Sequence, residues 1–211
     1  MLPKTLRTER YLEQTRRWPE SGRHILAHYD DETVVVYQAY SPGIGRYAAK
    51  HQRFGGSFSY ERMSWIKPNF LWMMYRSGWG QKPGQEVTLA ITLQREAFDR
   101  ILAGAVASSF RGAEEDRAAW KAKVKRSEVR LQWDPDHSPS GGKLERRAIQ
   151  LGLRGEALRL YGHEWIVAIE DISDFVAEQR GKHQGLITPQ ERVYRPADPS
   201  IAEHLRLDAA P

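Results

Sequence analysis

The chain has no cysteine among its 211 residues. Disulfides, thiolate catalysis, zinc–thiolate sites and iron–sulfur clusters are therefore excluded. No apolar run approaches the roughly 18 residues that span a membrane, and residues 1–18 lack the apolar core of a secretion signal. These absences predict a protein that stays out of membranes and works in the cytoplasm.

Several sequence motifs of catalysis are missing as well. The chain lacks a complete Gly-x-Gly-x-x-Gly fingerprint, a Gly-Lys-Ser/Thr phosphate loop, a His-Glu-x-x-His zinc motif and a Gly-x-Ser-x-Gly nucleophile elbow. The seven histidines are scattered singly, so their spacing favours no metal site. We predict a protein that binds no metal and has none of the standard nucleotide-cradling loops.

The chain does have a mild excess of positive charge. It carries 32 Lys and Arg residues against 27 Asp and Glu residues, with a net charge of +5 and an isoelectric point near 9.4. A basic balance favours a phosphate-bearing partner, because Lys and Arg neutralise phosphate. A nucleotide or a nucleic acid is therefore the expected partner, although many ordinary enzymes carry a similar charge.

The predicted elements favour one α+β domain over residues 23–185, between an N-terminal arm at 1–22 and a proline-containing tail at 186–211. Strands and helices do not alternate strictly, so we expect a mixed, mainly antiparallel sheet flanked by helices. Residues 33–40 are hydrophobic almost throughout, which is typical of a strand covered on both faces. Strands are predicted at 24–29, 33–40, 86–93, 128–133 and 164–169, helices at 43–54, 95–107 and 172–180, and a loop at 134–142.

Cations are interleaved with aromatic side chains between residues 62 and 80. Arg62, Lys67 and Arg76 can neutralise phosphate, and the rings of Trp65 and Tyr75 can each stack on a base for about 1–3 kcal/mol. Such cations are costly to bury without an anionic partner. They therefore either line a nucleotide site or form structural ion pairs.

The densest aromatic stretch covers residues 65–80, and periodicity alone does not separate a helix from a strand there. Within it, the apolar run 70–74 is expected to belong to the core. Arg76 follows this run and precedes Ser77 and Gly78, where the chain is expected to turn. We therefore predict that the Arg76 guanidinium lies at the end of an element and serves ligand binding more than folding.

Two glutamines stand in otherwise apolar segments. Gln38 interrupts the run 33–40, and Gln150 lies between Ile149 and Leu151. A buried amide is costly unless its hydrogen bonds are made. Each glutamine therefore either ties the sheet to a neighbouring loop or faces a ligand, and with the arginines the two favour a polar cleft.

Longer strings of residues make the chain recognisable. They are 37–40 (Tyr-Gln-Ala-Tyr), 62–68 (Arg-Met-Ser-Trp-Ile-Lys-Pro), 75–80 (Tyr-Arg-Ser-Gly-Trp-Gly), 85–86 (Gln-Glu) and 148–155 (Ala-Ile-Gln-Leu-Gly-Leu-Arg-Gly). With these strings the chain closely resembles the family catalogued as domain of unknown function 4291, over most of its length. This resemblance implies a single compact domain and brings no activity with it.

The order of segments is also similar to that of ADP-ribosyltransferases. These enzymes bind NAD with an early strand that bears a polar residue, then a short helix and a glycine, an aromatic strand, and a late strand that supplies Glu or Gln. Residues 37–40 match the first strand, residues 70–75 the aromatic strand, and Gln150 or Glu86 the late polar position. The chain departs from the pattern in having no His-Gly-Thr and in placing a glutamine at position 150.

This similarity implies an ADP-ribosyltransferase-like fold and an NAD-dependent enzyme that acts on nucleic acid or a nucleotide. Gln150 or Glu86 would be catalytic, orienting the ribose hydroxyl while an oxocarbenium-like centre forms. The three cations would hold the pyrophosphate, and Tyr37 or Tyr75 would stack on nicotinamide. The residues expected to bind NAD are Tyr37, Gln38, Tyr40, Arg62, Trp65, Lys67, Tyr75 and Arg76.

The alternative is a non-catalytic nucleic-acid-binding domain, which the positive charge and the cations among aromatics also favour. The continuous strands and apolar-flanked amides count against it, because simple binders keep their aromatic rings on an open sheet face. Binding of NAD would favour the enzyme. Retardation of single-stranded RNA that weakens steeply with salt would favour the binding domain.

Overall fold

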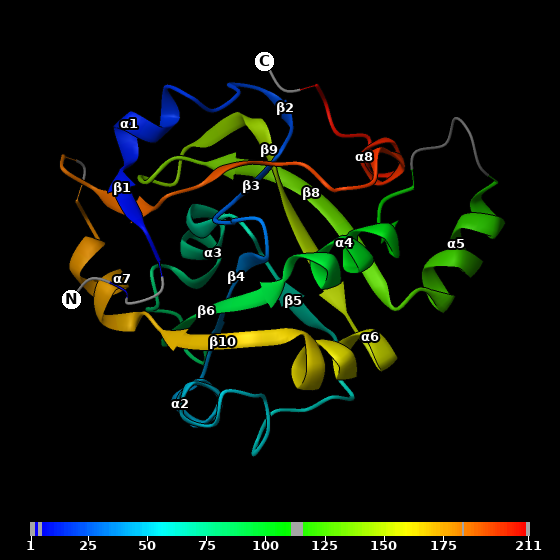
Figure 1. The fold of residues 1–211 in the computed structure, drawn as a ribbon, viewed down its shortest axis with the longest axis horizontal. Helices are drawn as coiled ribbons and strands as arrows, with labels where there is room; N and C mark the ends of the chain where they lie inside the picture. The colour runs from blue at the N-terminus through cyan, green and yellow to red at the C-terminus, as the bar shows by residue number, and fades with distance from the viewer. Residues whose placement is uncertain (1–2, 4–5, 111–115, 183, 210–211) are drawn as a thin grey trace.

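The computed structural model describes residues 3, 6–110, 116–182 and 184–209, which are built around two main sheets (Figure 1). The strands of these sheets are β2 (Gly22–Arg23), β4 (Thr33–Tyr40), β5 (Ser64–Ile66), β6 (Val87–Gln94), β7 (Ala105–Ala107), β8 (Val129–His137), β9 (Lys143–Leu153) and β10 (Ile166–Asp171). One sheet has the order β10–β6–β4. The other has the order β2–β9–β8–β7, with β5 also paired to β9.

Antiparallel pairing predominates in both sheets. β4, β6 and β10 pair antiparallel, as do β5 with β9 and β8 with β9. Only the pairs β2–β9 and β7–β8 are parallel among the described strands of these sheets. Helices flank the sheets, so the predicted α+β class with a mixed, mainly antiparallel arrangement is confirmed.

The helices are α2 (Pro42–His51), α3 (Phe70–Ser77), α4 (Arg95–Ala103), α5 (Arg117–Arg126), α6 (Gly155–Leu160), a π-helical turn (Tyr161–Trp165), α7 (Ser173–Gln179) and α8 (Pro199–Leu205). α2 and α4 pack against one face of the three-stranded sheet, and α3 and α7 pack against the other. None of the helices in the described ranges is long and apolar enough to cross a membrane.

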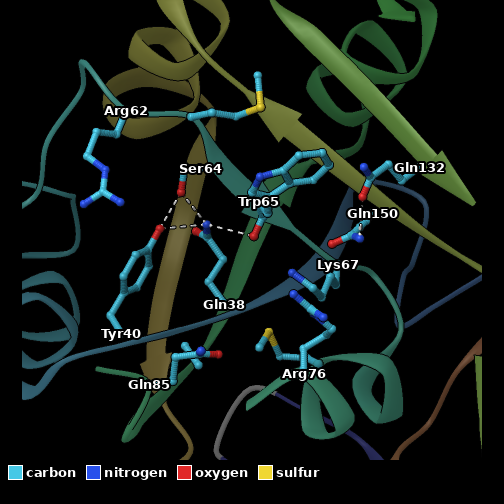
Figure 2. Close-up of a pocket in the computed structure, with 13 residues that line it drawn as sticks. Gln38, Tyr40, Arg62, Ser64, Trp65, Lys67, Arg76, Gln85, Gln132 and Gln150 are labelled. Atoms are coloured by element: carbon cyan, nitrogen blue, oxygen red, sulfur yellow. Dashed lines mark hydrogen bonds between the residues drawn. The ribbon is translucent and has the colours of Figure 1, made fainter. Parts of the chain in front are cut away.

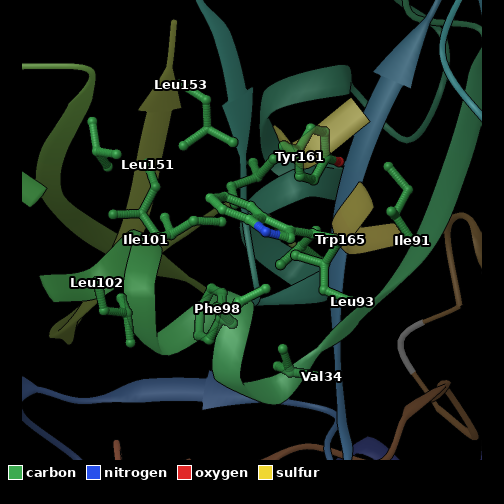
Figure 3. Packing of buried hydrophobic residues seen from close by; sticks show 14 of the residues in the cluster. Val34, Ile91, Leu93, Phe98, Ile101, Leu102, Leu151, Leu153, Tyr161 and Trp165 are labelled. Carbon is green, nitrogen blue, oxygen red and sulfur yellow. The ribbon is translucent and has the colours of Figure 1, made fainter. Parts of the chain in front are cut away.

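Strand β4 is buried on both faces. Val34 and Val36 face a cluster that fills the space between the two sheets and α4, which Figure 3 shows converging around Trp165. Val35 and Tyr37, one residue out of phase, face a second cluster formed with α3 and α7. The burial of successive residues confirms the prediction made from the continuous hydrophobic sequence of this strand.

An isolated β-bridge joins the edge of one sheet to the edge of the other. Immediately after β5, Lys67 pairs with Tyr37 of β4: the Tyr37 amide donates to the Lys67 carbonyl over 2.7 Å, and the Lys67 amide donates back over 3.2 Å. The backbone of Lys67 is thereby fixed at the junction of the sheets. Its side chain starts from this junction, where the polar pocket lies.

Segments near the two ends of the chain pack together. β1 (Thr8–Arg10), followed by α1 (Tyr11–Thr15), pairs with β11 (Ile187–Pro189), and β12 (Arg192–Tyr194) pairs with β3 (Ile25–Ala27). The residues predicted as an arm and as a tail therefore contribute paired strands. A buried polar cluster lies beside these strands, and we call it the terminal seam. Its members are Gln14, Asn69, Asp136, Arg146 and Glu191.

Residues 70–77 form helix α3, so the aromatic strand predicted at 70–75 is wrong. The Asn69 side chain caps the helix by accepting from the Trp72 amide over 2.7 Å. Gly78 ends it with a φ of 58°, a left-handed conformation that glycine adopts without strain. Because nearly every residue between these caps is apolar, periodicity alone could not separate a helix from a strand.

The loop predicted at 134–142 is shorter in the structure. β8 continues to His137, and β9 begins at Lys143, so only residues 138–142 connect them. The polar residues that suggested a loop are held in the ladder: Asp134 pairs with Ala148, and the Asp136 carboxylate forms an ion pair with Arg146.

Candidate functional site

A polar pocket of about 520 Å³ opens where the two sheets join (Figure 2). Its volume lies within the range of about 300–1,000 Å³ that is common for small-molecule sites. Seven of the ten residues predicted for the site line it, while Tyr37, Tyr75 and Glu86 do not. The lining residues are Gln38, Ala39, Tyr40, Arg62, Met63, Ser64, Trp65, Lys67, Met73, Arg76, Gln85, Gln132 and Gln150.

Gln38 organises one wall of the pocket. The period of two along β4 puts Gln38 and Tyr40 on the same face. The Gln38 amide nitrogen lies 2.8 Å from the Tyr40 hydroxyl, 2.8 Å from the Ser64 hydroxyl and 3.2 Å from the Trp65 carbonyl. Its amide oxygen accepts from the Tyr161 hydroxyl over 2.7 Å. The buried amide is therefore fully bonded and holds the two hydroxyls in place.

The hydroxyls of Tyr40 and Ser64 lie 2.5 Å apart. One of them donates to the other, which leaves the second hydroxyl hydrogen with no acceptor among the described residues. Burial raises the pKa of Tyr40 above its ordinary value, so its hydroxyl stays protonated at neutral pH. This wall therefore offers a hydrogen-bond donor to a ligand.

Lys67 brings a buried amine into the pocket. The residue is only 5% exposed, and no carboxylate in the described part of the chain lies within ion-pair distance of it. Burial, reinforced by the nearby Arg76 charge and opposed by Asp134, lowers the pKa of the Lys67 ammonium to about 7. A large share of Lys67 is therefore neutral near physiological pH.

Arg76 and Arg62 stand at different ends of the pocket. Arg76 comes from the last turn of α3, and its guanidinium lies beside the Lys67 amine, whereas Arg62 lies on the far side of Tyr40 and Ser64 (Figure 2). Neither arginine forms an ion pair with a carboxylate in the ranges that the structure describes. The ion pairs considered as the alternative from sequence are thus not found there.

Gln150 of β9 and Gln132 of β8 are register partners on a second wall. The Gln150 amide nitrogen donates to the Gln132 amide oxygen over 2.8 Å and to the Asp134 carboxylate over 2.7 Å. Both amide hydrogens are therefore used within the protein. The Gln150 amide oxygen faces the pocket, where it presents a fixed hydrogen-bond acceptor (Figure 2).

Three predicted site residues lie elsewhere. Tyr37 is completely buried against Phe70, with ring centroids 5.5 Å apart. Tyr75 lies on the opposite side of α3 and lines a separate cleft. Glu86 is exposed just before β6, where its carboxylate accepts from the Gly84 amide over 2.9 Å.

Ser64, Gln85 and Gln132 also line the pocket, although none of them is among the residues predicted to bind NAD or to be catalytic. The alternation of polar and apolar residues along β8 was the available signal for Gln132, because it puts this residue on the same strand face as Asp134. Ser64 carries no such signal, since its role depends on β5 lying beside β4.

The pocket has the chemistry of an anion site. Its lining includes two arginines, a lysine and four amide side chains, and it includes no Asp or Glu. Within the described ranges, no group of three or more His, Asp or Glu side chains is placed to hold a metal ion.

Residues 24–194 match the family described as a domain of unknown function (DUF4291), and the chain belongs to this family. All residues that line the pocket fall within the matched range. A search of curated proteins found no match.

Proposed function

We propose that the polar pocket binds NAD as a substrate and that the protein is an ADP-ribosyltransferase-like enzyme that acts on a nucleic acid or a nucleotide. One observation carries the proposal. Arg62, Lys67 and Arg76 line a single cavity, and none of them has a carboxylate partner among the described residues.

A pyrophosphate would supply the missing negative charge. Taking the Lys67 ammonium out of water without a partner is costly, and an anion in the pocket would offset that cost. Arg76 lies beside Lys67, so one phosphate can receive bonds from both side chains, and the arginine fork suits two oxygens of the same group. Arg62, at the other end, fits a second charged or polar part of the same ligand.

The uncharged walls suit a ribose. The unused hydroxyl hydrogen of the Tyr40–Ser64 pair is a donor, and the Gln150 amide oxygen is an acceptor. When the C–N bond between ribose and nicotinamide breaks, positive charge develops on the ribose. The negative end of the Gln150 amide dipole, already fixed by Gln132 and Asp134, would stabilise that charge.

Transfer of ADP-ribose to a hydroxyl or amine breaks the bond to nicotinamide, forms a new bond to the ribose carbon and releases one proton from the acceptor. Burial lowers the pKa of Lys67 to about 7 in the empty pocket, and a bound pyrophosphate would raise this pKa again. Lys67 would therefore hold the phosphate as an ammonium, and the released proton would pass to solvent.

Titration calorimetry with NAD and ADP-ribose, together with an assay of nicotinamide release in the presence of nucleic acid, tests this function. The wild type should bind both ligands and release nicotinamide. Gln150→Leu should keep NAD affinity within about threefold and lower nicotinamide release at least tenfold, as loss of a charge-stabilising group does. Gln81→Leu, an exposed glutamine outside the pocket, is the matched control. Absence of heat with either ligand at millimolar concentration would refute the proposal.

The second candidate is the non-catalytic nucleic-acid-binding domain. The exposed ring of Tyr75 beside the unpaired Arg76 favours it, because stacking and phosphate contacts together bind single strands. The wild type would then retard single-stranded RNA in a salt-dependent way and release no nicotinamide from NAD.

A further inference from the structure

A second cleft, of about 330 Å³, lies on the other side of helix α3 from the polar pocket. Residues three apart on a helix share a side, and accordingly Met73 and Arg76 face the polar pocket. Leu71, Met74 and Tyr75 face the second cleft, whose opposite rim is the connection between β8 and β9 at residues 138–142. Adjacent residues, Tyr75 and Arg76, therefore open into neighbouring sites.

Tyr75, which lines this cleft, is the exposed member of a group of stacked rings. It is 41% exposed, which is unusual for a large side chain beside an apolar helix face. Beneath it lies His137, with ring centroids 3.6 Å apart and planes at 17°, and Trp72 lies nearly parallel to Tyr75 at 5.5 Å. The rings of His137 and Trp72 are buried, so they fix the orientation of the Tyr75 ring.

An exposed ring that is already held in place makes a stacking platform. A base that stacks on such a ring gains about 1–3 kcal/mol, and little side-chain entropy remains to be lost. No ring other than those of His137 and Trp72 stacks on Tyr75 within the described ranges. The connection comes near the ring, since a Cβ added at Gly141 would lie 4.0 Å from two of its carbons, yet the side chain remains exposed.

The charges around the cleft indicate the class of ligand. Arg76 follows Tyr75 in the chain and lines the polar pocket. The Lys82 amine donates to the Arg76 carbonyl at the end of α3, and Lys143 is the register partner of His137. None of these three side chains is in an ion pair with a carboxylate that the structure describes. An exposed aromatic ring with cations nearby in the chain fits a chain of bases joined by phosphates.

We infer that this cleft is the subsite for a single-stranded nucleic acid acceptor, with a base stacked on Tyr75 and the adjoining phosphate held at Arg76. The inference rests on the proposed function, since it names the acceptor that the polar pocket would modify. It also assigns Tyr75 to the acceptor instead of to nicotinamide. The last turn of α3 then contacts both ligands: Tyr75 stacks on the acceptor base, and Arg76, which lines the NAD site, binds the acceptor phosphate.

Fluorescence anisotropy with a labelled single-stranded RNA hexamer, at low and physiological salt, tests this subsite. Tyr75→Ala should weaken binding at least fivefold, whereas Tyr75→Phe, which keeps the ring, should stay within about twofold of the wild type. Tyr47→Ala, an aromatic truncation on α2 outside both sites, should leave binding unchanged. NAD affinity should be the same in Tyr75→Ala as in the wild type, which also shows that the variant is folded.

The possible outcomes separate this inference from the proposed function. A wild type that binds NAD but not the hexamer, or a Tyr75→Ala variant that binds the hexamer normally, overturns the inference and leaves the NAD site standing. A hexamer affinity that depends on the ring in a protein that does not bind NAD supports the subsite and refutes the enzyme. A wild type that binds neither ligand refutes both.

Discussion

The polar pocket and the terminal seam both bury charged side chains, but they treat them differently. In the seam, the Arg146 guanidinium donates to the Asp136 carboxylate over 2.7 and 2.9 Å and to the Pro19 carbonyl over 2.6 Å. In the pocket, Lys67 is equally buried and has no carboxylate partner among the described residues. One region uses buried charge to join segments of the chain, and the other leaves it available.

This difference separates folding from binding. A buried ion whose partners are all within the chain adds to the specificity of the fold. Removing one partner leaves the other buried without a partner, which lowers stability. A buried ion without a partner lowers stability, and a ligand of opposite charge can recover that loss on binding. The seam should therefore respond to mutation through stability, and the pocket through affinity.

The largest expected effect is the loss of stability on replacing Arg146 by Met. The substitution leaves Asp136 buried and unpaired, and it also removes the bond of 2.6 Å from Arg146 to the Pro19 carbonyl. We expect urea unfolding to show a loss of about 3–5 kcal/mol. NAD affinity of the folded protein should not change.

The matched control for this variant is Arg159→Met, which breaks the exposed pair of Arg159 with Glu156 and should cost less than about 1 kcal/mol. If the two variants were equally stable, the buried Arg146–Asp136 pair would contribute no more to stability than an exposed ion pair does. If Arg146→Met abolished NAD binding while still folded, the division between the two regions would fail.

The second prediction concerns Lys67→Met and its dependence on pH. The pKa of Lys67 is about 7 in the folded protein against 10.5 for the free side chain, so the unfolded chain binds more protons between these values. Wild-type stability should therefore rise with pH across that window on account of this residue, and below pH 7 the full cost of burying the ammonium is present. Met removes this cost.

Lys67→Met should accordingly be more stable than the wild type at pH 6, by at least the ~1.4 kcal/mol of one pKa unit, and the advantage should shrink towards pH 10. Burial raises the pKa of Glu191 to about 8, which makes stability fall between pH 4.5 and 8. That contribution is present in both proteins, so the difference between their thermal melts isolates the effect of Lys67.

NAD binding should weaken at least tenfold in the Lys67→Met variant. A variant less stable than the wild type at pH 6 would mean that Lys67 has a structural partner.

The sequence predicted the pocket better than the seam, for a physical reason. Gln38, Gln150 and the three cations stand out because polar residues within or beside apolar runs need a special explanation. The seam joins Gln14, Asn69 and Glu191, which are far apart in the sequence and have no local pattern. Nothing in the sequence indicates that such residues meet.

Helix α3 shows where local reasoning stops. If this segment were a strand, residues 73 and 75 would share a face. In the helix, Met73 and Arg76 both face the polar pocket, and Tyr75 faces the second cleft. The cap at Asn69 and the glycine at position 78 carried the information that the apolar run did not. Glu86 shows the same limit, since β6 begins one residue later and Gln85 enters the pocket instead.

The smallest effect on stability, and the sharpest test of the comparison, is expected from Arg76→Lys. The guanidinium is exposed, lies 5.9 Å from the centre of the Trp72 ring, and forms no ion pair within the described ranges, so thermal melts should show a loss below ~1 kcal/mol. The charge is kept, yet lysine cannot give a phosphate two parallel hydrogen bonds. Calorimetry should therefore show NAD affinity about tenfold lower, equivalent to ~1.4 kcal/mol, while Arg159→Lys binds as the wild type does. A protein that melts far lower but binds NAD normally while folded would place Arg76 with the seam, among the groups that hold the chain together.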